Sequence, residues 1–319
     1  MAVGVRDKRW LAAVAFAFVS CHGVQQKTIA VIPKGTAHLF WLSVEAGAVA
    51  AGKNLGVRVL WTGPAQETEY DRQIQIVDSM IARHVDGMAI AAAEKTALVH
   101  SIDRASASGI PVTVFDSGVD TDHYVSFIAT NNYQAGQMAA RELARLLNQK
   151  GKIAVLMHTP GSASTMEREN GFYETMAKEF PAIRVAARQY GMSDRSKAMA
   201  AAEDMLTANP GLDGMFASAE PSSVGAALAV KTRGLTGKIK LVAFDSTDSL
   251  IQDLRNGVIN SLVVQDPFEM GYKAVATLVD KFNGKTPPKR IDVPAYVVRK
   301  DDLDKPDVKQ LLNPALRKS

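Results

Sequence analysis

The chain has 319 residues, of which 47% are hydrophobic and 22% are charged, a composition typical of a globular protein with two domains or one large one. The formal net charge is +4, but the basic residues are scattered without interleaved aromatic residues, which argues against a nucleic-acid partner. The only cysteine is Cys21, so no disulfide can form within the chain and stability must come from the burial of apolar surface.

The N-terminus has the pattern of a signal peptide. Three basic residues at positions 6–9 precede the apolar run Leu11–Val19, which is shorter than the about 20 residues that span a bilayer. We therefore expect residues 1–20 to be a signal peptide and the protein to reach the periplasm or cell envelope. Cys21 then resembles the lipidated cysteine of a bacterial lipobox, although Phe18 stands where leucine is commonest. The alternative is a soluble exported protein.

The next stretch, Thr28–Trp41, joins a run of β-forming residues to a polar and aromatic loop. In an open α/β sheet, ligands bind beyond the carboxyl ends of the strands, so the side chains of this loop are candidate ligand contacts. Lys34 suits an acidic or phosphorylated ligand, or a neighbouring carboxylate. His38 is either a ligand contact or an exposed loop residue. Phe40 and Trp41 either contact a ligand or begin the core face of a helix.

Apolar, β-prone runs alternate with helical patterns along the rest of the chain. Tyr70, Ile74, Val77 and Ile81, for example, recur on one face of a predicted helix. Apolar strands separated by helices are typical of parallel sheets that are buried on both faces. The predicted strands are Ile29–Ile32, Val57–Trp61, Gly87–Ala91, Val112–Phe115, Val125–Ile128, Ile153–Met157, Val185–Tyr190, Gly214–Ala217, Leu241–Phe244, Ser261–Val264 and Ala295–Val298.

The strand–helix pattern occurs twice. The units before about residue 131 end their strands in polar loops, and the units after residue 151 do the same. We therefore predict an α/β protein with two Rossmann-like lobes, each a parallel sheet flanked by helices, whose strand ends face each other. The crevice between two such lobes is the natural place for a ligand.

Several segments in a fixed order carry a family resemblance. They are TIAVIPKGTAHLFW, HVDGMAIAAAEKTALVHSIDRASASGIPVTVFDS, VSFIATNNYQAGQMAA, GSASTMERENGF, LVAFDSTDS and SLVVQDPFEMGYKA. Over roughly residues 27–303 the chain resembles the ribose-binding type of periplasmic sugar-binding proteins, the capture subunits of ABC sugar importers. The effector domain of lactose-type repressors has the same fold, but a signal peptide stands here where those proteins carry a helix-turn-helix.

The resemblance implies a set of ligand contacts. Asp116 and Asp245 would accept hydrogen bonds from sugar hydroxyls. Arg168 would donate to the sugar, and Gln265 would both donate and accept. Asp116 and Asp245 could instead cap the helices that follow them. Arg168 could instead pair with a neighbouring glutamate, and Gln265 could serve only in a hinge.

The apolar faces of a sugar ring suit planar aromatic side chains, so Phe40 and Trp41 could sandwich such a ring. Three positions depart from the ribose-type pattern. Ser117 follows Asp116 at a position where the family usually has an arginine. Glu220 lies next to a position where the family has an asparagine that this chain lacks. Met192 lies in a region where the family has an aromatic residue that this chain also lacks. We expect all three to contact the ligand. The ligand would then be another pentose or hexose, a sugar alcohol or a sugar acid.

The resemblance also implies a mechanism. Residues 27–130 with 266–293 would form the N-terminal lobe, and residues 131–265 with 294–319 the C-terminal lobe. The lobes would close about a hinge of three segments on a sugar or polyol, and the closed monomer would dock on the permease subunits of an ABC importer. The alternative is a sensor that presents the closed form to a chemoreceptor or histidine kinase.

Sequence motifs of enzymes are absent. The chain has no glycine-rich nucleotide loop, no G-x-S-x-G elbow and no H-x-x-x-H or H-E-x-x-H spacing. We therefore expect no catalytic residue, no cofactor and no metal. Asp116 and Asp245 could be read as the acid and base of a glycosidase, but nothing in the sequence would raise the pKa of either carboxyl group.

Overall fold

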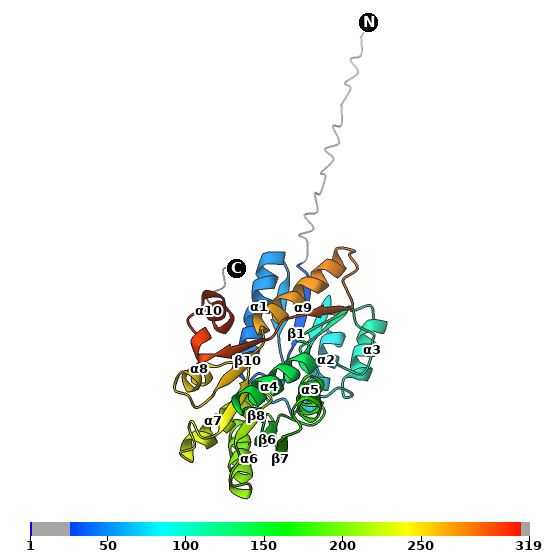
Figure 1. Cartoon of the computed structure of the whole chain (residues 1–319). Coiled ribbons are helices and arrows are strands. Elements are labelled where there is room, and N and C mark those ends of the chain that lie inside the picture. The colour runs from blue at the N-terminus through cyan, green and yellow to red at the C-terminus, as the bar shows by residue number, and fades with distance from the viewer. Residues whose placement is uncertain (2–25, 314–319) are drawn as a thin grey trace.

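The computed structural model describes Met1 and residues 26–313 of the chain (Figure 1). The predicted signal peptide, the predicted lipidation at Cys21 and the last six residues of the predicted C-terminal lobe lie wholly or almost wholly outside the described residues. Within the described part, no helix has both the length and the apolar character needed to cross a membrane.

Strands and helices alternate along the chain, as predicted. The strands are β1 (Thr28–Ile32), β2 (Arg58–Trp61), β3 (Gly87–Ile90), β4 (Val112–Phe115), β5 (Ser126–Ala129), β6 (Gly151–Met157), β7 (Ile183–Tyr190), β8 (Gly214–Ala217), β9 (Lys240–Phe244), β10 (Ser261–Val264), β11 (Arg290–Asp292) and β12 (Tyr296–Arg299). The helices are α1 (Leu39–Leu55), α2 (Tyr70–Ala82), α3 (Val99–Ala107), α4 (Asn132–Leu146), α5 (Ala163–Glu179), α6 (Arg195–Ala208), α7 (Glu220–Thr232), α8 (Asp248–Arg255), α9 (Pro267–Phe282) and α10 (Pro306–Leu312), with a short 3-10 helix at Lys300–Asp302.

The strands form two sheets with equivalent orders, β11-β5-β4-β3-β1-β2 and β12-β10-β9-β8-β6-β7. The predicted α/β class with two parallel sheets is confirmed, with one exception: the edge strand β12 pairs antiparallel with β10. The edge strand β11 was not predicted, because its three residues, Arg-Ile-Asp, contain no apolar run. We call the first sheet with α1, α2, α3 and α9 the N-terminal lobe, and the second sheet with the other helices the C-terminal lobe.

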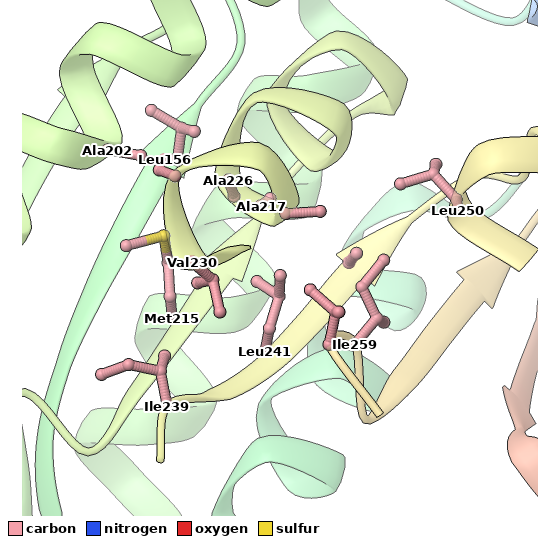
Figure 2. Close-up of a cluster of buried hydrophobic side chains, with 14 of the residues drawn as sticks. Leu156, Ala202, Met215, Ala217, Ala226, Val230, Ile239, Leu241, Leu250 and Ile259 are labelled. Carbon is pink, nitrogen blue, oxygen red and sulfur yellow. The ribbon is translucent and has the colours of Figure 1, made fainter. Parts of the chain in front are cut away.

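Helices cover both faces of each sheet, because successive residues of a strand point to opposite sides. In β6, Ala154 and Leu156 face the core beneath α6, α7 and α8, which Figure 2 shows in close-up. Ile153 and Val155 of the same strand face the other core, beneath α4 and α5. In Figure 1 the N-terminal lobe occupies the upper part of the molecule and α6 and α7 the lower part.

Helices α4 and α5 pack unusually closely, and this contact positions a site residue. A Cβ atom on Gly136 of α4 would lie 1.9 Å from the Arg168 carbonyl oxygen of α5, and one on Gly171 would lie 2.1 Å from the Tyr133 carbonyl oxygen. Any larger residue at either position would force the helices apart. Glycine is therefore required here for the two backbones to touch, and the contact fixes the part of α5 that carries Arg168.

The chain passes between the two sheets three times. It crosses between β5 and α4, between β10 and α9, and between β11 and β12. Helix α9 follows a strand of the second sheet but packs on α1 and on strands of the first. The carboxyl ends of the parallel strands in each lobe therefore lead into loops that meet between the lobes.

Candidate functional site

A cavity lies between the two lobes, at the carboxyl ends of their strands. Its walls come from the loops after β1, β2, β4, β6, β8, β9 and β10, and from the first turns of α1, α5 and α7. The lining residues are Lys34, His38, Phe40, Trp41, Glu67, Asp116, His158, Ser164, Thr165, Arg168, Ala219, Glu220, Pro221, Asp245 and Gln265. The structure thus brings most of the predicted site residues together, while Ser117 and Met192 do not line the cavity.

Asp116 and Asp245 occupy equivalent places in the two lobes. Asp116 directly follows β4, and Asp245 directly follows β9. Both have a left-handed backbone, with φ of 56° and 66°, a conformation that is uncommon outside glycine and is tolerated best by aspartate and asparagine. The left-handed residue ends each strand abruptly and turns the carboxylate into the cavity. Asp245 does not cap α8, because Thr247 does so.

Asp245 is held by two donors from the protein. Its Oδ2 accepts a hydrogen bond from the backbone N–H of Glu220 at 3.0 Å, and its Oδ1 accepts one from Gln265 Nε2 at 2.8 Å. Burial raises the pKa of Asp245 to about 6, because the opposing effects of Arg168 and Gln265 only partly offset the loss of water. Asp245 therefore titrates near neutral pH, which the sequence did not indicate.

Arg168 is completely enclosed by the C-terminal lobe. Its Nε and Nη2 donate to Asn132 Oδ1 at 3.2 and 2.7 Å, and its Nη1 donates to the Ser218 carbonyl oxygen. The guanidinium carbon lies 3.5 Å from the centre of the Phe244 ring. Burial lowers the pKa of Arg168, but a guanidinium stays charged in proteins. Arg168 therefore gives the cavity a fixed positive charge and is not paired with Glu169 by a hydrogen bond.

The ammonium group of Lys34 binds to other side chains of the protein. Its Nζ donates to Ser162 Oγ at 3.1 Å and to Ser164 Oγ at 3.2 Å, and it lies 3.3 Å from Asp116 Oδ2. Of the two roles that the sequence left open, the structure shows the pairing with a carboxylate. The loop that carries Lys34 is fixed by Gln73 of α2, whose Nε2 donates to the Pro33 carbonyl oxygen at 2.8 Å.

Glu67 and His158 belong to the site, although sequence reasoning did not select them. His158 Nε2 donates to Glu67 Oε2 at 2.8 Å, across the two lobes. His158 follows β6 directly, so the rule that selects polar residues at strand ends would have found it. Glu67 lies six positions after the end of β2 in an irregular loop, and no sequence signal marks it.

The aromatic pair has a different arrangement from the one predicted. The Phe40 and Trp41 rings are perpendicular, with centroids 4.9 Å apart, so they cannot sandwich a sugar ring between them. Trp41 is 1% exposed, packs in the core against Phe115, and donates its indole N–H to Glu67 Oε1 at 2.9 Å. Phe40 is only partly buried and lines the cavity, so it is the better placed of the two to stack on a ligand.

His38 and Glu220 face each other across the cavity. His38 Nε2 lies 2.9 Å from Ser193 Oγ in the other lobe, and His38 Nδ1 lies 3.9 Å from Glu220 Oε2. Glu220 is also paired with Arg195 through Oε1. Met192 lies on the same turn as Ser193 but is 37% exposed and points away from the cavity lining, because the turn reaches the cleft through Ser193.

Ser117 is fully buried just behind the cavity wall. Its Oγ accepts a hydrogen bond from the backbone N–H of Ser164 at 3.3 Å, so it joins the two lobes. The predicted ligand contact at Ser117 is thus a contact between lobes in this structure. The physical reason is the short serine side chain, which stops at α5 before it reaches the cavity.

The cavity presents hydrogen-bond acceptors that have no donor within the described residues. They are Asp116 Oδ2, His158 Nδ1, Glu220 Oε2 and Gln265 Oε1. Asp116 Oδ2 has Lys34 as an ion-pair partner but accepts no hydrogen bond. Because buried acceptors without a donor are costly, this set suits a ligand rich in hydroxyl donors. Among the described residues, no group of side chains has the arrangement of a metal site.

The chain is similar to proteins of known family. The family model of the periplasmic binding protein domain matches residues 29–286. Among curated relatives, the ribose import binding protein of Bacillus subtilis is 26% identical over 255 residues, which make up 80% of this chain and 81% of the relative.

Solved structures are similar over nearly the whole chain. A carbohydrate transporter solute-binding protein of Agrobacterium radiobacter, in complex with D-arabinose, is 33% identical, with a TM-score of 0.89 and coverage of 91% of this chain and 100% of that one. An ABC transporter solute-binding protein of Agrobacterium vitis, bound with α-D-tagatopyranose, is 31% identical, with a TM-score of 0.87 and coverage of 90% and 99%.

Proposed function

Because the chain belongs to the periplasmic binding protein family, we propose that it captures a sugar or a sugar-like polyol between its two lobes and delivers it to an ABC importer. The resemblance inferred from the sequence is confirmed by the family match and by the ribose-binding relatives. The bound sugars of the similar structures, D-arabinose and α-D-tagatopyranose, support a monosaccharide as ligand here. Proteins of this family bind and carry their substrate, and this role agrees with the expectation that the present protein is not an enzyme.

The cavity between the lobes is the observation that carries this function. Both lobes contribute carboxylates, Asp116 and Asp245, and the unpartnered atoms of the cavity are acceptors. Lys34 and Arg168 already donate to protein atoms. A neutral polyol would supply the missing donors, whereas a sugar acid would bring a further carboxylate close to Asp116 Oδ2 and Glu220 Oε2, which accept no hydrogen bond. We therefore favour a neutral pentose, hexose or sugar alcohol over a sugar acid.

The proposed site contains Lys34, His38, Phe40, Trp41, Asp116, Arg168, Glu220, Asp245 and Gln265. Phe40 would stack on the sugar, and Asp116, Asp245, Glu220 and Gln265 would accept from its hydroxyls. Lys34 and Trp41 would support these residues from behind. Ser117 and Met192, which line no part of the cavity, are not included.

We also propose how the lobes close, where the protein is located and that it is a monomer. The lobes, 27–130 with 266–293 and 131–265 with 294–319, would move as two bodies about the three chain crossings. A ligand that contacts both lobes stabilises only the closed form, which would then dock on the permease. The family implies a periplasmic location, and a lipid anchor through Cys21 remains part of the proposal, as does the monomeric state. No specific observation favours the alternative role as a sensor.

A thermal-shift screen tests this function. The purified protein is heated with each member of a panel of pentoses, hexoses, sugar alcohols and sugar acids at millimolar concentration. A ligand that binds only the folded form raises stability by about 2.7 kcal/mol when it is present at 100 times its Kd. We expect one or more neutral members to raise the melting temperature. If no sugar or polyol raises it, the proposed ligand class is wrong.

A further inference from the structure

Besides His38, which contacts Ser193 across the cleft, three buried charged or titratable side chains connect the lobes through contacts with protein atoms. They are Lys34 and Glu67 of the N-terminal lobe and His158 of the C-terminal lobe, which are 3%, 5% and 2% exposed. The proposed sugar contacts do not account for them, because their polar atoms, apart from His158 Nδ1, meet other protein atoms. The bonds of Lys34 with Ser162 and Ser164 and the bond of His158 with Glu67 cross the cleft, so they exist only when the lobes are together.

Lys34 supplies one half of this connection. Its ammonium group donates to Ser162 Oγ and Ser164 Oγ in the C-terminal lobe and forms an ion pair with Asp116 in its own lobe. The ammonium group is therefore held by protein atoms of both lobes. The two serine bonds cross the cleft, so opening the lobes would break both.

Glu67 supplies the other half. Its Oε1 accepts from Trp41 Nε1 at 2.9 Å, and its Oε2 accepts from His158 Nε2 at 2.8 Å and lies 3.8 Å from Lys34 Nζ. Trp41 belongs to the core of the N-terminal lobe, so the carboxylate is held in place before it meets His158. The bond to His158 crosses the cleft.

The surroundings favour the charged form of Glu67. Burial by itself would raise the Glu67 pKa, but the charge of Lys34 and the hydrogen bond from His158 outweigh it and hold that pKa well below its usual range. Burial lowers the pKa of His158, which favours the neutral imidazole. Because the Glu67 carboxylate can only accept, His158 Nε2 is the donor of their bond. His38 also faces Glu67, with Nε2 4.0 Å from Oε1. A buried ion pair whose bonds are satisfied in this way avoids the usual penalty of an unpaired charge.

We propose that Lys34, Glu67 and His158 form a latch that holds the two lobes closed by contacts between protein side chains alone. The inference rests on the proposed function, because it concerns the cleft that captures the ligand. The latch raises the closed fraction of the free protein. A sugar then binds a cleft that is largely preformed, and its apparent affinity rises with the closed fraction. Entry of the sugar waits for the latch to open, so association is slowed.

Small-angle X-ray scattering of the ligand-free protein tests the latch. We expect the wild-type profile to match that of the closed structure. Glu67→Gln removes the charge that pairs with Lys34 and leaves only one acceptor oxygen for Trp41 and His158, and Lys34→Met removes both serine bonds at nearly constant side-chain length. We expect both variants to scatter as more extended particles. Glu179→Gln, which breaks the exposed pair with Arg141 within the C-terminal lobe, is the matched control and should leave the profile unchanged.

Two scattering results would overturn the latch: a wild-type protein that is already open without ligand, or variants that remain closed. Circular dichroism confirms that each variant is folded, and if Lys34→Met does not fold, Glu67→Gln decides the question. Neither scattering result depends on a sugar, so the latch can fail while the proposed function stands. If instead no sugar binds but the latch is present, the proposed function fails alone.

Binding kinetics separate a latch from an ordinary ligand contact. For any sugar that passes the thermal-shift screen, we expect Glu67→Gln to raise the association rate several-fold and the dissociation rate by a larger factor. A residue that only touches the ligand changes dissociation and leaves association nearly constant. An unchanged association rate in Glu67→Gln would therefore contradict the latch.

Discussion

The two lobes place an aspartate at the same point of the same backbone turn, yet Asp116 and Asp245 have different electrostatic environments. Asp116 faces the ammonium of Lys34 at 3.3 Å. Asp245 is held by an amide and a backbone N–H, and burial raises its pKa to about 6. The fold repeats the position of the carboxylate, while its neighbours differ: a lysine ammonium beside Asp116 and a glutamine amide beside Asp245.

This difference gives the two walls of the cleft different roles. On the N-terminal side, a carboxylate and a lysine neutralise each other and leave Lys34 to reach the opposite lobe. On the C-terminal side, Arg168 is bound to Asn132 and Ser218, so Asp245 has no cation in hydrogen-bonding contact. We infer that the N-terminal wall contributes mainly to closure and the C-terminal wall mainly to recognition.

The largest effect is expected from Arg168→Met. The substitution leaves the carboxyl groups of Asp116 and Asp245 without their shared buried cation and leaves Asn132 Oδ1 without its donor. Breaking a buried charge network in this way costs about 3–5 kcal/mol. Urea unfolding should show this loss, together with loss of sugar binding. Arg141→Met, on the exposed face of the same lobe, is the control and should change the free energy of unfolding by less than about 1 kcal/mol.

The next effect compares Asp116→Asn with Asp245→Asn. Both variants remove an acceptor for sugar hydroxyls, so calorimetric titration should show affinity lower by about 1.5–3 kcal/mol in each. Their stabilities at pH 7.5 should differ in direction. Asp116→Asn removes the nearer of the two carboxylates that pair with Lys34 and lowers the melting temperature, whereas Asp245→Asn removes a buried charge and does not. Equal losses of melting temperature would refute the contrast between the two walls.

The pH dependence of binding should come from Asp245. A carboxyl group with a raised pKa stabilises the closed fold while it is protonated, and this contribution is lost as pH rises from about 4 through 6. Sugar hydroxyls that donate to the carboxylate favour its ionised form, so affinity should fall below pH 6, by up to about tenfold per pH unit. Titrations between pH 5 and 8 measure this change. Asp245→Asn should be flat over the same range, and a slope that survives in the variant would assign it to another group.

The smallest effect separates the two aromatic residues. Phe40→Ala removes the ring that faces the cavity and should weaken sugar binding by about 1 kcal/mol. Trp41→Phe keeps an aromatic core side chain but removes the hydrogen bond to Glu67, so it should lower stability by about 1 kcal/mol with a smaller effect on affinity. Calorimetry and thermal melting of both variants distinguish these outcomes. A stronger effect of Trp41→Phe on affinity would restore Trp41 as a direct contact.

The fold and much of the site follow from local sequence patterns. Apolar runs predicted every strand except β11, whose residues lie at a sheet edge and bury little surface. The family resemblance predicted Asp116 and Asp245 as ligand contacts, and both lie at strand ends, where all parallel strands of a lobe meet the cleft. Side-chain direction was not predictable: Trp41 points into the core, and Met192 points to solvent while its neighbour Ser193 enters the cleft.

The contacts between the lobes could not be predicted from the sequence either. Glu67 and His158 are 91 positions apart, and their bond depends on how the two lobes close rather than on any local pattern. The role of Lys34 was left open for the same reason, since its serine partners lie in the other lobe. Local periodicity describes each lobe, whereas the chemistry between the lobes requires their relative placement.

A crystal structure of the protein with the sugar that gives the largest thermal shift shows directly whether the cavity between the lobes is the binding site. We predict one sugar ring in the cavity between the lobes, with hydroxyl groups within hydrogen-bonding distance of both Asp116 and Asp245 and an apolar face against Phe40. A sugar bound outside this cavity, or bound to one lobe only with the cleft open, would contradict the account.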